Sequence, residues 1–117
     1  MNQVNLRPLK KFRSVPYSEE YKTELTQLAK LLRDAAASTD NASLKKFLLL
    51  RADAFLSNDY LASDFAWMDL DSPVDVTIGP YETYNDELFG YKAAFEAYVN
   101  VRDAKESVDA VADLIEP

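Results

Sequence analysis

The sequence predicts a mainly helical α+β fold, with three N-terminal helices, a short pair of β-strands and a C-terminal helix. Apolar residues recur at helical spacing as far as residue 68 and again from residue 104. Between these segments apolar and polar residues alternate, which is typical of strands. The chain has 117 residues, 48% of them hydrophobic, so it can bury one core.

The chain divides into a leader and one folded region. Residues 1–16 show no periodicity and contain Pro8 and Pro16, so we expect an extended leader. We expect residues 17–117 to form a single α+β region. Ser18 is a suitable N-cap, and the apolar residues that follow it predict a first helix over residues 18–37: Tyr21, Leu25, Leu28, Leu32 and Ala35.

A second helix is predicted over residues 43–57, and its apolar stripe is broad: Leu44, Phe47, Leu48, Arg51, Ala52 and Phe55, widened by Leu49 and Leu50. Such a helix packs on more than one side. We therefore expect the chain alone to expose apolar surface at residues 47–50 and along the strand 74–78, and to self-associate. Asn58 and Asp59 predict the cap of a third helix that continues to Met68.

Two strands and a last helix complete the predicted fold. Residues 74–78 alternate between apolar and polar, and Gly79–Pro80 predicts a turn that ends this strand. Residues 91–101 alternate again and predict the partner strand. The C-terminal helix is predicted over residues 104–115 by four apolar residues at helical spacing: Val108, Val111, Ala112 and Ile115.

The composition excludes several classes of function. The chain has no cysteine and no histidine, so it holds neither the thiolate nor the imidazole that usually binds zinc, and no histidine base. Residues 58–117 carry three basic and fourteen acidic side chains, a balance that argues against nucleic-acid binding. No apolar stretch is long enough for a membrane span, and the first residues lack a secretory signal, so we expect a cytoplasmic location.

Residues 67–101 are the candidate functional segment, because they hold the only tryptophan, both glycines and four of the seven tyrosines. Glu82 and Tyr84 are two residues apart, so both can point to the same side of an extended backbone. A carboxylate can bind a substrate ammonium group, and a phenol can donate a hydrogen bond to an oxyanion. A structural interpretation is also open, in which Tyr81 and Tyr84 are half-buried aromatics and Glu82 is solvated.

The spacing of residues in this segment resembles a known family. Ile78-Gly79 is followed by two residues, Glu82, one residue and Tyr84, and then by Phe89-Gly90 and Phe95-Glu96. The segment resembles the dipeptidyl peptidase III-like zinc metallopeptidases, in the region upstream of their His-Glu-x-x-Gly-His motif. The similarity is clearest over residues 65–101 and extends to the preceding helices.

The resemblance implies that Glu82 helps to bind the amino-terminal end of a peptide, that Tyr84 stabilises the oxyanion, and that Glu96 belongs to the same cleft wall. The motif that supplies the zinc ligands has no counterpart in this sequence. We therefore expect no metal site in this chain, zinc in the parent protein, and no hydrolysis by the chain alone. On this interpretation the chain is a non-catalytic part of the substrate lobe of a larger peptidase, and its partners are the remainder of that peptidase and the peptide substrate.

Three alternatives use other features of the chain. A carboxylate-only hydrolase could pair Glu82 with Asp86 or Glu87 as acid and base. A calcium site could use oxygen ligands from an acidic loop, namely Asp69, Asp71 and Asp75. A stand-alone helical interaction module without enzymatic activity could dock a partner on the broad apolar face of the second helix.

Overall fold

The computed structural model of the protein describes residues 12–115, and its elements confirm the mainly helical α+β fold. Their order is α1 (Tyr17–Glu20), α2 (Lys22–Ala37), α3 (Ala42–Ser57), α4 (Leu61–Met68), β1 (Val74–Glu82), β2 (Ala94–Val101) and α5 (Ala104–Ile115). Of the expected leader, residues 12–16 form neither helix nor strand, and residues 1–11 lie outside the described part of the chain.

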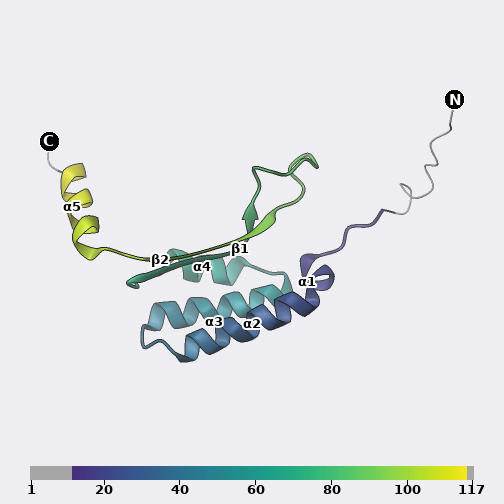
Figure 1. Cartoon of the computed structure of the whole chain (residues 1–117), viewed down its shortest axis with the longest axis horizontal. Helices are drawn as coiled ribbons and strands as arrows, with labels where there is room; N and C mark the ends of the chain where they lie inside the picture. Colours follow the sequence, from purple (N-terminus) through teal and green to yellow (C-terminus); the bar gives the residue numbers. More distant parts are fainter. Residues whose placement is uncertain (1–11, 116–117) are drawn as a thin grey trace.

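The core lies between α2 and α3, which form a helical hairpin beneath the sheet (Figure 1). Each helix buries one stripe at helical spacing, as the apolar periodicity predicts. The stripe of α2 is Leu25, Ala29, Leu32 and Ala36, and that of α3 includes Leu44, Phe47, Leu48, Ala52 and Phe55. Phe47, Phe55 and Ala29 are fully buried, so side chains from the two helices exclude water from their interface.

The start of α3 is capped by Asn41, which also ties the helix to the loop before β1. The side-chain oxygen of Asn41 accepts a hydrogen bond from the Leu44 amide at 2.9 Å, and its amide nitrogen donates to the Asp71 carbonyl at 2.9 Å. Ser43 adds a second link, because its hydroxyl accepts a hydrogen bond from the Asp71 amide at 3.0 Å. These bonds satisfy a free amide of the first turn and fix the entry to β1.

Two predicted N-caps, Ser18 and Asn58, are wrong. The expected first helix is interrupted at Tyr21 (φ −110°, ψ 31°), and the residue before it is Pro16, so Ser18 does not cap it. Asn58 adopts φ 62° and ends α3 instead of starting the next helix, a left-handed conformation that asparagine tolerates. The third helix therefore begins at Leu61, whose amide donates to the Asp59 carboxylate at 3.2 Å.

β1 and β2 form a two-stranded antiparallel sheet that lies alongside the helices (Figure 1). The register runs from Val74 opposite Val101 to Gly79 opposite Glu96, then shifts so that Glu82 pairs with Ala94. The turn predicted at Gly79–Pro80 is wrong, because β1 continues to Glu82. The strand tolerates Pro80 because it lies in the irregular stretch, where no ladder bond requires its missing N–H.

The apolar surface that this chain exposes differs from the predicted one. Phe47 and Leu48 are buried in the core and Val76 is only 8% exposed, so the expectation of exposure there is wrong, although Leu49 is exposed. A helix stripe and a strand face that contact each other inside the chain account for this burial. About half of the exposed large apolar residues lie instead on α4, β2 and α5: Leu61, Phe65, Trp67, Met68, Tyr98, Val99, Val101, Val108, Val111, Leu114 and Ile115. Self-association stays a prediction. Within residues 12–115, no helix has the length and apolarity needed to cross a membrane.

Candidate functional site

Glu82 and Tyr84 meet where β1 runs into the following loop. Glu82 is the last residue of β1, and its Oε1 accepts a hydrogen bond from the Tyr84 amide at 2.8 Å. The Tyr84 side chain is 96% exposed, so the interpretation of this residue as a half-buried aromatic is wrong. The structure thus brings the two predicted residues together and leaves the phenol free to meet a ligand.

The loop after Glu82 is organised by Asp86. Its carboxylate accepts hydrogen bonds from the Leu88 amide at 3.0 Å and the Lys92 amide at 3.1 Å. These two backbone bonds hold the pKa of Asp86 below its ordinary value, because they stabilise the charged form. The ionised carboxylate therefore keeps the loop folded back towards β2.

An acidic hollow of about 450 Å³ lies beside this loop. Its lining carries three carboxylates and one ammonium group, within the residues Glu82, Asn85, Asp86, Glu87, Leu88, Lys92, Ala93 and Ala94. An excess of carboxylates in a concave surface favours a positively charged ligand group. The hollow therefore suits a cation such as the amino terminus of a peptide.

Glu96 does not share this hollow. It lies opposite Gly79 in the sheet, and it lines a separate hollow of about 370 Å³. The lining of that hollow is mostly apolar, with Arg51, Asp64, Trp67, Met68, Thr77, Ile78 and Tyr81 as the other residues. Glu82 and Glu96 thus line two separate hollows, whereas the exposed Tyr84 lies close to Glu82 and lines neither of them.

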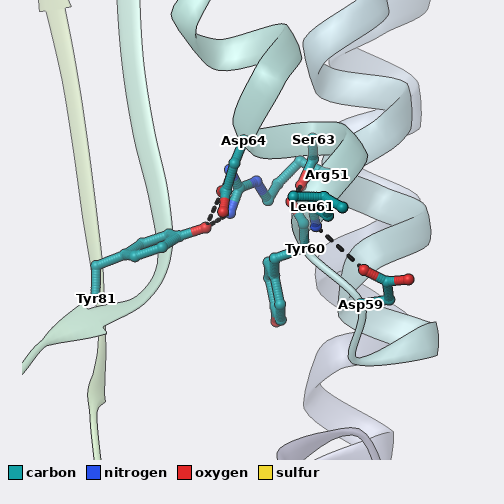
Figure 2. Close-up of polar contacts among 7 residues, drawn as sticks. All are labelled: Arg51, Asp59, Tyr60, Leu61, Ser63, Asp64 and Tyr81. Atoms are coloured by element: carbon teal, nitrogen blue, oxygen red, sulfur yellow. Dashed lines mark hydrogen bonds and ion pairs between the residues drawn. The ribbon is translucent and has the colours of Figure 1, made fainter.

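A buried arginine in the wall of the second hollow joins three elements. We call Arg51, Asp64 and Tyr81 the Arg51 cluster. Figure 2 shows Arg51 of α3, Asp64 of α4 and Tyr81 of β1 pointing towards one another. Arg51 Nη2 lies 2.8 Å from Asp64 Oδ1, and Nη1 donates to the Tyr81 hydroxyl, which itself donates to Asp64. The arginine side chain is 2% exposed and that of Asp64 is 45% exposed, so solvent reaches the ion pair from the Asp64 side.

Aromatic rings surround the guanidinium group of Arg51. Its central carbon lies 5.2 Å from the ring centroids of Phe47 and Tyr81 and 5.3 Å from that of Tyr60, within the range of cation–π attraction. Burial raises the pKa of Tyr60 to about 12, against the opposing effect of the arginine charge. Burial and the hydrogen bond to Asp64 also raise the pKa of Tyr81, so both phenols stay protonated at neutral pH.

Gly79 allows the strand to pass directly over this cluster. Its φ is +152°, and a Cβ at this position would overlap the Tyr81 ring and lie 3.0 Å from Arg51 Nη1. Only glycine combines that backbone angle with so close an approach. The position of β1 is therefore coupled to the buried arginine.

The sequence did not predict this cluster. Arg51 occurs on the apolar stripe of the second helix, at helical spacing from Phe47 and Phe55. An arginine on a stripe that becomes buried requires a partner, because an unpaired buried charge is very costly. That signal points to a buried ion pair, but it does not identify Asp64 and Tyr81, which are 13 and 30 residues away.

The described residues do not fit a zinc ion. Within residues 12–115, no three histidine, cysteine, aspartate or glutamate side chains converge on a point that could hold a metal. The calcium alternative at Asp69, Asp71 and Asp75 has no such arrangement either. Glu82, Asp86 and Glu87 line one hollow. Their oxygens are not all available to a metal, because one oxygen of Glu82 and both oxygens of Asp86 already accept hydrogen bonds from backbone amides.

Comparisons with known proteins agree over most of the chain. The family model of peptidase family M49 matches residues 10–116. The structure of dipeptidyl-peptidase III from Corallococcus sp. strain EGB matches 91% of this chain, with a TM-score of 0.83 and 57% sequence identity. The structure of DPP III from Caldithrix abyssi matches 88%, with a TM-score of 0.84 and 56% identity. A plant relative, Nudix hydrolase 3 of Arabidopsis thaliana, is 54% identical over 96 residues, or 82% of this chain.

The matched regions are small parts of these relatives. The chain covers 20% of each solved structure and 12% of the plant protein. It therefore corresponds to one portion of a dipeptidyl peptidase III-like protein, as the spacing of Glu82, Tyr84, Phe89-Gly90 and Phe95-Glu96 predicted. Because the family model extends over almost the whole sequence, the chain belongs to peptidase family M49.

Proposed function

We propose that this chain forms part of the substrate-cleft wall of a zinc-dependent dipeptidyl peptidase-like hydrolase and is inactive alone. Its partners are the remainder of that peptidase and a peptide substrate, and its region of the fold, residues 17–117, belongs to the substrate lobe. The observation that carries the proposal is the pairing of Glu82 with an exposed Tyr84 at the end of β1, in a member of family M49. A cytoplasmic location is part of the same proposal.

Glu82 would bind the amino terminus of the peptide. Its single bond to the Tyr84 amide uses one of about four lone-pair sites on the carboxylate, which leaves capacity for an ammonium group. The neighbouring carboxylates of Asp86 and Glu87 add negative potential to the same hollow. Glu82 would therefore contribute to binding in the ground state and the transition state alike.

Tyr84 would donate a hydrogen bond to the oxyanion that develops at the scissile carbonyl. The backbone bond to Glu82 fixes the start of its side chain, and the phenol projects into open space. If the remainder of the peptidase holds the phenol towards the developing charge, this donor would stabilise the transition state more than the ground state. Glu96, in its separate hollow, would contact the peptide elsewhere along the cleft wall.

The metal would be held by residues outside this chain, because the described side chains do not provide a ligand set for it. When bound there, zinc supplies Lewis-acid chemistry and an activated water. The residues of this chain would orient the peptide and donate hydrogen bonds. Isolated from that metal, they have no means to activate water.

The test uses the full-length peptidase that contains this chain. Tyr84→Phe should lower kcat by about a hundred- to a thousand-fold with little change in KM, which is the loss expected for one oxyanion donor. Glu82→Gln should act mainly on KM, and N-acetylation of the peptide should remove much of the difference from wild type. Tyr98→Phe, at an exposed tyrosine of β2, is the matched control. A kcat for Tyr84→Phe within about threefold of wild type would exclude the oxyanion role.

A further inference from the structure

We propose that Tyr81 is a positioning residue: its hydroxyl group, bonded to Arg51 and Asp64, fixes the strand end that carries Glu82 and Tyr84. This inference rests on the proposed function of Glu82 and Tyr84. It assigns to the Arg51 cluster a role in substrate binding in addition to any contribution to the stability of the fold.

The sheet itself does not hold this part of β1. Pairing with β2 is regular as far as Gly79 and resumes at Glu82, and Pro80 and Tyr81 have no partner in the register. A strand segment without ladder bonds depends on other contacts for its position. The side chain of Tyr81 supplies that contact, one residue before Glu82.

The two side chains that bond to the Tyr81 hydroxyl, Arg51 and Asp64, belong to packed helices. Arg51 lies in the middle of α3 with its guanidinium group enclosed by the rings of Phe47, Tyr60 and Tyr81, and it is fully buried. Asp64 belongs to α4, so the Tyr81 hydroxyl is bonded to two helices at once. A hydrogen-bond network whose members are packed in this way has few alternative geometries.

The Tyr81 ring also packs closely against the backbone at Gly79. A Cβ there would overlap the Tyr81 ring, so the ring lies against the strand from which it projects. The irregular stretch, Pro80 and Tyr81, thus lies between two residues that pair with β2, Gly79 and Glu82. Releasing the hydroxyl should allow the strand end to move without unfolding the helices.

The first measurement is amide hydrogen exchange in the full-length protein, comparing wild type, Tyr81→Phe and Tyr60→Phe. Tyr60 is the matched control because its ring covers the same guanidinium, whereas its hydroxyl has no hydrogen-bond partner in the described part of the chain. Tyr81→Phe should speed exchange at the Tyr84 amide by about tenfold and leave the amides of α3 unchanged. Tyr60→Phe should change the exchange rate of the Tyr84 amide by less than about twofold. Unchanged exchange in Tyr81→Phe would overturn the proposal.

The second measurement is a double-mutant cycle on KM for a peptide with a free amino terminus. Tyr81→Phe should raise KM by about five- to tenfold in the wild-type background and by less than about twofold when Glu82→Gln is already present. An equal rise in both backgrounds would show that Tyr81 acts only on stability. If Glu82→Gln alone leaves KM within about twofold of wild type, the proposed function of Glu82 is wrong, and the exchange rate of the Tyr84 amide decides the role of Tyr81.

Discussion

Gly79→Ala should destabilise this chain far more than an ordinary glycine-to-alanine change in a strand. The added Cβ would overlap the Tyr81 ring and approach Arg51 Nη1 to 3.0 Å, and φ is +152°. Overpacking costs about 1–3 kcal/mol, and a backbone conformation restricted to glycine costs about 1–3 kcal/mol. The smaller entropy of alanine in the unfolded chain offsets about 0.4–1 kcal/mol. The net loss should be about 2–4 kcal/mol.

Gly90→Ala is the matched control for this prediction. Gly90 also has a positive φ, +76°, but a Cβ there would meet no atom within 4 Å. It should therefore show only the backbone cost of roughly 1–2 kcal/mol, reduced by the same unfolded-state entropy. The difference between the two variants isolates the contact with Tyr81 and Arg51.

The assay is denaturant unfolding of the purified chain, with coincident probes to establish two-state behaviour. A loss of 3 kcal/mol should also lower Tm by roughly 10 °C for a chain of this size. In a Tyr81→Ala background the cost of Gly79→Ala should fall, because the ring is no longer there to clash. Equal destabilisation by Gly79→Ala and Gly90→Ala would refute the reasoning, since it would mean that nothing lies over Gly79.

Three further predictions concern the cap, a buried phenol and the acidic loop. Asn41→Ala should cost about 1–2 kcal/mol in denaturant unfolding, because it removes the cap of α3 and the link to Asp71; a change near zero would contradict this. Tyr60 has a folded pKa raised from 10.0 to about 12, so its contribution to stability is complete below pH 10 and is lost as pH rises to about 12. The difference between wild type and Tyr60→Phe should follow that window, and a difference independent of pH would exclude it. The Leu88 and Lys92 amides should titrate with a midpoint below 3.8 in NMR, and Asp86→Asn should abolish the transition; a midpoint at or above 3.8 would show that these bonds do not form.

Periodicity predicted the helices whose apolar spacing is regular along their own sequence. The second helix was expected over residues 43–57 and is found at Ala42–Ser57, because Asn41 caps its start and a buried stripe that is apolar except for Arg51 runs along it. The C-terminal helix was expected at residues 104–115 and begins and ends there. For the second helix the local signal and the final contacts agree. The C-terminal helix follows its local signal alone, because none of its residues is buried.

Features that depend on contacts between distant residues were not predictable in this way. Gly79–Pro80 is a common turn signal, yet β1 continues through it because the Tyr81 ring and Arg51 hold the strand. The burial of Phe47 and Leu48 depends on how α3 packs against its neighbours, which a single stripe does not determine. For the site, that Glu82 and Tyr84 share one side of the strand end stays a prediction, and spacing did not predict that Glu96 lines a different hollow.

The exposed apolar faces bear on the choice between a portion of a peptidase and a stand-alone interaction module. α5 is a 12-residue helix with no buried residue, and a helix of about that length is marginal in water without a surface to pack on. α4 and β2 also expose large apolar side chains, so a stand-alone module would need a partner that reaches several elements at once. The chain covers 20% of the solved dipeptidyl-peptidase III structures, so the rest of such a protein could meet these faces without a separate partner.

β2 enters α5 at the end of the sheet where Val74 pairs with Val101, whereas Glu82 and Tyr84 lie at the other end (Figure 1). Covering α5 would therefore leave the acidic hollow open to a peptide.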